Sequence, residues 1–217
     1  MITFKEQDLQ LLPKQGHCNL NYLLEQNGKK YLVRKFKLAD RDRNLEYKIQ
    51  KLAFQKGIAA KPLYMDDSIM IGEFVEGIHK KKLSKKELRQ LALVIKKLHK
   101  IKLRQRPVNF PKKIMRKVRK FKKELVLCHG DLSVNNILFE NTTMLIDWEY
   151  AGVNDKYFDL ASICMEFKLT KLEETFFLRA YGGKIDFEKL EGYKEIFDIL
   201  SKEWFEQLEK GKLEFLS

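Results

Sequence analysis

The sequence has little cysteine and no long hydrophobic run, and both absences narrow the classes of protein it can represent. The three cysteines, Cys18, Cys128 and Cys164, are odd in number, widely spaced and free of any CxxC pair, which predicts a reduced, intracellular protein. The first ten residues lack the basic and apolar regions of a signal peptide. No apolar run approaches the roughly 18 residues of a membrane span. We therefore expect a cytoplasmic protein without a transmembrane segment.

Disorder is excluded as well, because the chain of 217 residues is 44% hydrophobic and 12% aromatic. A chain of this length buries roughly 70% of the surface that it exposes when unfolded. It needs neither disulfides nor a structural metal, and its length fits one domain or two small lobes.

Positive charge is concentrated in one segment. The formal net charge is +13, yet residues 80–123 alone hold 20 Lys and Arg against the single acid Glu87, so the other 173 residues sum to −6. Such a segment can be a solvated helix face, or it can attract nucleic acid, an anionic membrane surface or a phosphorylated ligand. Both interpretations stay open at this point.

The first 76 residues are patterned mainly as strands. Apolar runs at 22–25 and 31–34 flank Asn27-Gly28, which is the strongest short hairpin signal because both turn residues must adopt positive φ. A helix is predicted over 41–56, ended by Gly57, and two further strands over 61–65 and 69–74. The order is strand, strand, helix, strand, strand.

After Gly77 the patterns become helical. Ser84 with Glu87 predicts a capping box at the start of a helix, and a second, basic helix is predicted from Pro111. Short strands are expected at 125–128, 137–140 and 144–146. The remainder is predicted to be helices interrupted by Gly182-Gly183, Gly192 and Gly211.

The chemistry is concentrated in HGDLSVNNILF at 129–139 and LIDWEYAG at 145–152. A strand ends at His129, a loop presents Asp131 and Asn136, and a second hairpin strand ends at Asp147. Phosphoryl transfer needs one carboxylate that orients the acceptor hydroxyl and takes its proton, and oxygen ligands that hold Mg²⁺ against the phosphates. Asp131 suits the first role, and Asn136 and Asp147 suit the second.

These two strings, with the second extended through DKYFDLA, resemble the choline/ethanolamine kinases and the related aminoglycoside phosphotransferases, over about 40 residues. The resemblance implies an α+β, two-lobed protein-kinase-like fold. Residues 1–76 would form a small N-terminal nucleotide-binding lobe with an antiparallel sheet. Residues 77–217 would form a mostly helical lobe that carries the catalytic and acceptor-binding groups.

The resemblance also implies nucleotide contacts in the N-terminal half. Gly16 and Asn19 lie where the family has a short phosphate loop, although a plain turn explains them too. Arg34 would grip the nucleotide phosphates, with Glu46 as its ion-pair partner, and a surface salt bridge is the alternative. The backbone groups of the connector that includes Glu73 and Val75 would meet adenine. ATP and Mg²⁺ are the implied cofactors.

The acceptor is predicted from the second string and from residues after it. The WEYAG string resembles the choline/ethanolamine branch, and Glu166 falls where choline kinases place an acid beside the quaternary ammonium. Aromatic faces and a carboxylate are what such a cation requires, although aromatic residues at helical spacing are more often core. The predicted acceptor-binding residues are Ser133, Glu149, Glu166, Tyr157 and Trp204.

The sequence thus predicts an ATP- and Mg²⁺-dependent kinase of choline or a similar amino-alcohol. Thiamine, an aminoglycoside or another small alcohol is the nearby alternative, because the segment between the connector and His129 is shorter than in eukaryotic choline kinases. A non-catalytic protein that binds nucleic acid or a membrane through residues 80–123 is the alternative from another class. The kinase prediction requires no nucleic acid, leaves peripheral membrane contact open and specifies no oligomeric state.

Overall fold

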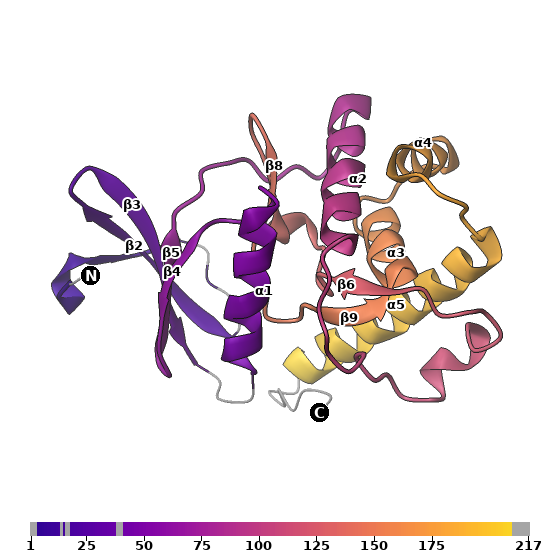
Figure 1. Ribbon diagram of the computed structural model, residues 1–217, viewed down its shortest axis with the longest axis horizontal. Helices are drawn as coiled ribbons and strands as arrows, with labels where there is room; N and C mark the ends of the chain where they lie inside the picture. Colours follow the sequence, from indigo (N-terminus) through magenta and orange to yellow (C-terminus); the bar gives the residue numbers. More distant parts are fainter. Residues whose placement is uncertain (1–3, 14, 16–17, 38–40, 210–217) are drawn as a thin grey trace. The chain divides into compact units, whose positions relative to one another are not determined.

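A five-stranded antiparallel sheet occupies the N-terminal part of the computed structural model, which describes residues 4–13, 15, 18–37 and 41–209 (Figure 1). A short 3-10 helix, η1 (Glu6–Asp8), precedes its first strand. The strand order is β1-β2-β3-β5-β4, with these bounds: β1 (Leu9–Leu11), β2 (Asn19–Gln26), β3 (Lys29–Phe36), β4 (Pro62–Met65) and β5 (Ile69–Glu73). The predicted strand pattern is confirmed, and β1 is an additional edge strand.

The turn between β2 and β3 is the Asn27-Gly28 hairpin expected from the sequence. Both residues have positive φ, 52° and 69°, which asparagine and glycine tolerate best. This turn fixes the register, and the register places Leu24, Val33 and Ile71 together as the buried cluster of the sheet.

Helix α1 (Arg43–Gln55) follows the sheet's third strand and begins where a side chain caps it. The Asp42 carboxylate accepts the Leu45 N–H at 2.9 Å, which satisfies one of the otherwise unpaired amides of the first turn. Ile49 and Ala53 are fully buried on the same helix face. The helix predicted over 41–56 is confirmed.

The described residues form two compact units. One holds the chain up to Lys80 together with Asn135–Ala151, and the other holds Lys81–Val134 and the chain from Gly152 onward. The hairpin of β7 (Ile137–Phe139) and β8 (Thr143–Leu145) therefore belongs with the N-terminal sheet. The predicted lobe boundary after residue 76 stays a prediction.

Backbone contacts join this hairpin to the N-terminal residues of its unit. Ile78 exchanges two backbone hydrogen bonds of 3.0 Å with Phe139, and Leu145 donates to Ile58 at 2.9 Å. Gly77 makes the close approach feasible, because a Cβ added there would lie 2.9 Å from the Leu138 Cβ.

The second unit is mostly helical, as predicted. Helix α2 (Lys85–His99) packs on α4 (Lys171–Tyr181), and α3 (Lys156–Glu166) packs on α5 (Phe187–Glu209) (Figure 1). The two-stranded sheet of β6 (Leu125–Cys128) and β9 (Gly152–Asp155) lies beside α3. Ser84 and Glu87 form the predicted capping box of α2.

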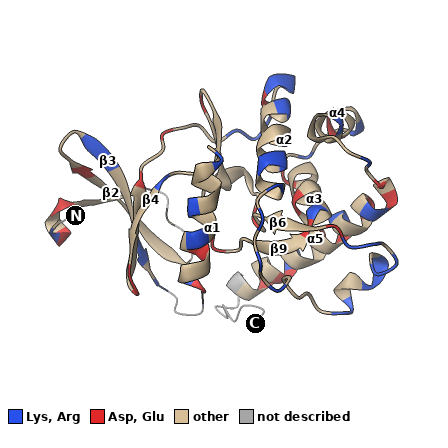
Figure 2. Ribbon diagram, in the orientation of Figure 1, with Lys and Arg blue, Asp and Glu red and all other residues tan. Residues whose placement is uncertain are grey.

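The predicted basic helix from Pro111 is wrong. The structure has only the 3-10 helix η2 (Ile114–Lys117), followed by turns. Lys and Arg recur in this segment at helical spacing, so a continuous helix would stack like charges along its exposed faces. Two of these lysines instead pair with acids of α5, Lys117 with Glu195 and Lys120 with Glu188. Figure 2 shows Lys and Arg at several places along α2 and the segment after it.

The predicted helix break at Gly192 is also wrong, because α5 continues through this glycine. A Cβ at Gly192 would lie 2.8 Å from Cγ1 of the buried Val118. The absence of a side chain at Gly192 therefore permits the close approach of the η2 segment to α5, and local propensity does not end the helix. The predicted break at Gly211 lies outside the described residues.

Candidate active site

The centre of the first unit is a buried network of charged side chains around Arg34 of β3. Its guanidinium donates from one terminal nitrogen to Glu46 of α1 at 2.6 Å, and from the other to Asp147 at 2.7 Å. Burial by itself would lower the pKa of Arg34, but the two carboxylates outweigh burial and raise it. Arg34 is therefore permanently charged and fixed in orientation, which suits a residue that faces phosphate oxygens.

Arg34 and Asp147 also line a cavity of about 380 Å³, counting the space that is open to solvent. Glu73, at the end of β5, is part of the same wall. The predicted nucleotide residues Arg34 and Glu73 thus share one cavity with the predicted metal ligand Asp147. The remaining walls are mainly apolar and include Leu32, Met70, Leu145, Ile146 and Trp148.

The β7–β8 hairpin brings the two predicted metal ligands to neighbouring positions. The 3-10 helix η3 (Val134–Asn136) leads directly into β7, and Asp147 lies two residues after the end of β8. The Ile146 N–H donates to the Asn136 carbonyl at 3.0 Å, one step beyond the Ile137–Leu145 pair of the ladder. Strand pairing therefore places Asn136 beside the residue that precedes Asp147.

Asp147 has a backbone conformation that non-glycine residues rarely adopt, with φ of 66°. Such a conformation costs about 1–3 kcal/mol and persists only where the surroundings enforce it. The hydrogen bond to Arg34 and the end of the hairpin are two such constraints. Together, Asn136 and Asp147 offer an amide and a carboxylate oxygen, the hard donors that fit Mg²⁺.

The Glu149 side chain is only 7% exposed, and its contacts with Asn19 and Arg43 lie within its own unit. Its Oε2 accepts from Asn19 Nδ2 at 3.2 Å and lies 3.4 Å from an Arg43 nitrogen. Burial, and secondly the charge of Asp147, raises the pKa of Glu149. Burial and the adjacent Glu149 raise the pKa of the Cys18 thiol to about 12. Glu149 and Asn19 are thus placed to support each other, while Gly16 lies outside the described residues.

The second unit presents the loop that carries Asp131. Asp131 and Ser133 are half-buried, and the residues just before them are anchored from α3. The Asp159 carboxylate accepts the backbone N–H groups of His129 at 2.9 Å and Gly130 at 3.1 Å. The loop therefore approaches Asp131 along a fixed backbone path.

Glu166, at the end of α3, contacts the same loop. Its carboxylate accepts the backbone N–H of Val134, three residues after Asp131. Burial raises the pKa of Glu166, and the hydrogen bond only partly offsets that effect. Glu166 is half-buried, so a titratable carboxylate lies beside the Asp131 loop within this unit.

Three comparisons with known proteins bear on this site. Residues 109–193 match the model of the phosphotransferase enzyme family. Protein LicA of Haemophilus influenzae is 42% identical over 65 residues, which are 29% of this chain and 24% of LicA. The chain thus spans about a quarter of that relative.

Two solved structures share the fold. Choline kinase LicA from Streptococcus pneumoniae superimposes with a TM-score of 0.78 and 23% identity, covering 96% of this chain and 88% of that one. A spectinomycin phosphotransferase, solved with ADP and spectinomycin, superimposes with a TM-score of 0.73 and 16% identity. The superposition covers 92% of this chain and 82% of that one.

The chain resembles the phosphotransferase family. The family match and the shared fold confirm the resemblance and the kinase-like α+β fold that were predicted from the sequence. They also support a kinase-type enzyme. Within the described residues no helix combines the length and apolarity needed to cross a membrane.

Two predicted acceptor residues of this phosphotransferase-like chain pack against other side chains of their own unit. Tyr157 is 1% exposed, its hydroxyl accepts the Asp186 N–H at 2.7 Å, and the Lys189 ammonium lies 4.4 Å from its ring centroid. Trp204 of α5 packs edge-on against Phe205, with ring centroids 5.1 Å apart. Tyr157 therefore serves the core of its unit.

Sequence reasoning missed two residues that position predicted site residues, one in each unit. Arg43, one turn before Glu46, donates to Glu46 at 2.7 Å and so shares it with Arg34. Asp159 anchors the Asp131 loop, although the sequence presents it only as one letter of the extended motif. The signal for Asp159 was its place in that motif, whereas nothing local distinguishes Arg43 from other basic residues.

Proposed function

We propose that this chain transfers the γ-phosphoryl group of ATP to the hydroxyl of a small cationic alcohol, with choline or ethanolamine as the first candidates. The proposal depends chiefly on the hairpin that sets Asn136 beside the residue preceding Asp147, with Asp147 bonded to Arg34. Catalysis of phosphoryl transfer consists almost entirely of positioning and electrostatic stabilisation, and these residue types supply both.

In the proposed reaction, Asp131 accepts a hydrogen bond from the acceptor hydroxyl and orients its oxygen toward the γ-phosphorus. A new P–O bond forms at that oxygen while the bond between the γ-phosphorus and the bridging β–γ oxygen breaks. The hydroxyl proton passes to the Asp131 carboxylate, and ADP leaves with the electron pair of the broken bond. A positioned carboxylate of this kind contributes about 10²- to 10⁴-fold.

The first unit would hold the donor. Arg34 would bind phosphate oxygens through its fixed guanidinium, and the backbone near Glu73 and Val75 would meet the base. Asn136 and Asp147 would hold Mg²⁺, which neutralises phosphate charge when bound. Glu149 with Asn19 would support the donor residues of this unit. In the proposal Glu149 holds these neighbouring residues in place, because its carboxylate is buried against Asn19 and Arg43.

A cationic acceptor is favoured by the charge distribution. Outside residues 80–123 the chain sums to −6, and Glu166 lies next to the Asp131 loop. A quaternary ammonium has no hydrogen-bond donor, so a nearby carboxylate and aromatic faces are its natural partners. Ser133, two residues after Asp131, and Trp204 complete the proposed acceptor set.

The experiment that tests this function is an ADP-release assay with ATP and Mg²⁺ over choline, ethanolamine, thiamine and spectinomycin. We expect stimulation by choline or ethanolamine that disappears in Asp131→Asn. Turnover on thiamine or spectinomycin alone would replace the acceptor but keep the reaction class. Absence of turnover on every hydroxyl acceptor would contradict the proposal.

Glu166→Gln should raise the KM for choline about 10-fold, with kcat and the KM for ATP changed less than about 2-fold, because only attraction to the ammonium is lost. In the parent protein, burial raises the pKa of Glu166. Its choline KM should therefore begin to rise on acidification at a higher pH than an ordinary glutamate would give, and the variant should lack this dependence. Glu203→Gln, at an exposed position of α5, is the matched control. A changed ATP KM with an unchanged choline KM would contradict the assignment.

A further inference from the structure

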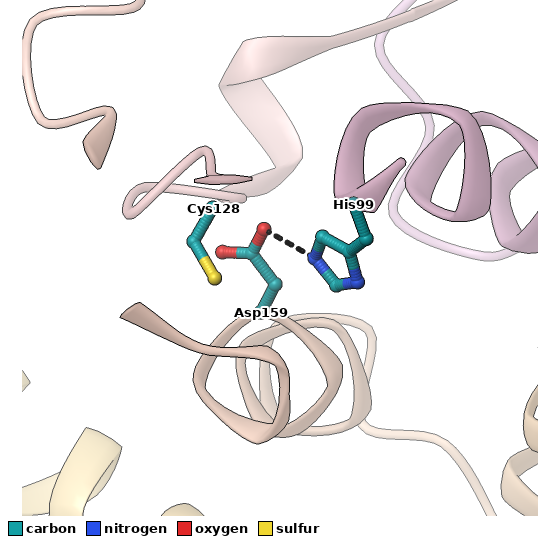
Figure 3. A group of neighbouring side chains, drawn as sticks. All are labelled: His99, Cys128 and Asp159. Atoms are coloured by element: carbon teal, nitrogen blue, oxygen red, sulfur yellow. Dashed lines mark hydrogen bonds and ion pairs between the residues drawn. The ribbon is translucent and has the colours of Figure 1, made fainter. Parts of the chain in front are cut away.

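The helical unit contains a buried histidine that links three helices to the Asp131 loop. His99 ends α2, and both of its ring nitrogens have partners: Nε2 lies 3.1 Å from Asp159 Oδ2 on α3, and Nδ1 lies 2.9 Å from the Tyr181 hydroxyl on α4. Figure 3 shows His99 directed at the Asp159 carboxylate. Because a carboxylate only accepts, Nε2 carries the hydrogen in this pair.

The same carboxylate holds the backbone of the loop. Asp159 Oδ2 accepts from His99 and from the His129 N–H, and Oδ1 accepts from the Gly130 N–H. Asp159 and His129 are fully buried, and His99 is 7% exposed. In such surroundings these hydrogen bonds are stronger than they would be in water, and their geometry is tightly coupled.

The contact with His99 thereby sets the rotamer of Asp159, and Asp159 sets the path of residues 129–130. Gly130 has φ of 82°, a conformation in which glycine is unstrained, so the chain turns sharply just before Asp131. A tilt of the Asp159 carboxylate would move both amides, and with them the carboxylate of Asp131. Misplacement of a reacting group by about 1 Å can cost about 10²-fold in rate.

A metal site is the other use that this cluster suggests, because the Cys128 thiol lies close to His99 and Asp159 (Figure 3). The contacts disfavour it. The Cys128 thiol donates to the Asp155 carbonyl at 3.5 Å, and both Asp159 oxygens already accept hydrogen bonds. Burial raises the pKa of Cys128 well above its usual value, so the thiol keeps its proton and is a poor ligand.

We infer that His99 is a positioning residue for phosphoryl transfer, which it serves by orienting Asp159 and so the loop that carries Asp131. Tyr181 fixes the other side of the imidazole. The effect on catalysis rests on the proposed function, but the role of His99 in holding residues 129–130 through Asp159 can be tested without any activity.

The experiment compares four variants by amide hydrogen exchange and by steady-state kinetics. His99→Leu removes both hydrogen bonds at similar volume, and His99→Gln restores an N–H donor toward Asp159. Tyr181→Phe removes only the hydroxyl. Cys164→Ala is the matched control, since Cys164 is buried on α3 and shares none of these bonds.

In His99→Leu, exchange at the His129 and Gly130 amides should rise about 10-fold, and kcat should fall about 10- to 100-fold with both KM values within about 2-fold. Amide exchange and kcat of Tyr181→Phe should lie between those of His99→Leu and the parent. His99→Gln should recover most of kcat. Cys164→Ala should match the parent in amide exchange and in kcat.

Three results would overturn the inference: exchange in His99→Leu equal to that in Cys164→Ala, loss of rate without rescue by His99→Gln, or one stoichiometric metal ion per chain that His99→Leu loses. If the parent protein turns over no acceptor, the proposed function fails, and the exchange measurement still decides the role of His99 in holding the loop.

Discussion

Asp131→Asn should lower kcat about 10²- to 10⁴-fold while the affinity for a fluorescent ATP analogue changes less than about 3-fold. Asparagine keeps the size of the side chain and one acceptor oxygen, but its NH₂ group replaces the second oxygen, and the amide cannot take the hydroxyl proton. The proposed donor residues Arg34 and Asp147 belong to the other compact unit. The measurement is ADP release with the best acceptor of the panel, together with a binding titration.

Asp198→Asn provides the matched control, because it makes the same chemical change on α5, where Asp198 pairs with Lys202. It should leave kcat within about 2-fold, since a helical surface pair contributes only about 0.3–0.5 kcal/mol. Retention of the parent kcat by Asp131→Asn would remove Asp131 from the mechanism. A parallel loss of melting temperature in Asp131→Asn alone would show that the loop itself had been disrupted.

The parts of the fold that were predictable from sequence are those with local causes. Asn27-Gly28 dictates a hairpin because few other residue pairs tolerate two positive φ values, and Ser84 with Glu87 caps α2 within one turn. The loop and hairpin that carry Asn136 and Asp147 were equally predictable. Their spacing along the chain specifies a strand, a tight turn and a returning strand, which is what the structure contains.

The parts that were not predictable depend on contacts between distant residues. The basic segment has apolar residues at helical spacing, but lysines paired with α5 and the approach of Val118 to Gly192 decide its form. His99 and Asp159 are separated by 60 positions, and Asn19 and Glu149 by 130. No local pattern specifies such pairs, so the sequence left His99 without a role and did not predict the contact between Asn19 and Glu149.

Arg34→Met should lower both the free energy of unfolding and nucleotide affinity. Arg34 is 6% exposed and lies between the buried Glu46 and the partly exposed Asp147, so its removal takes away the cation that the two carboxylates share and leaves Glu46 with Arg43 alone. Breaking a buried pair from one side costs about 3–5 kcal/mol. Urea denaturation measures this loss. Lys35→Met on the same strand is the control, because Lys35 pairs with the exposed Glu6 and should cost no more than about 1 kcal/mol.

The double variant Arg34→Met, Glu46→Gln separates the two consequences. Neutralising Glu46 removes a buried carboxylate that would pair with Arg43 alone, so part of the lost stability should return, whereas affinity for ATP should stay low because no guanidinium at position 34 faces the phosphates. Arg34→Lys should have intermediate stability and intermediate affinity for ATP. A single ammonium cannot reproduce a guanidinium that donates to Glu46 and Asp147 from separate nitrogens. If the double variant regains stability and ATP affinity together, Arg34 serves only the fold, and the donor site must draw its positive charge from elsewhere in the chain.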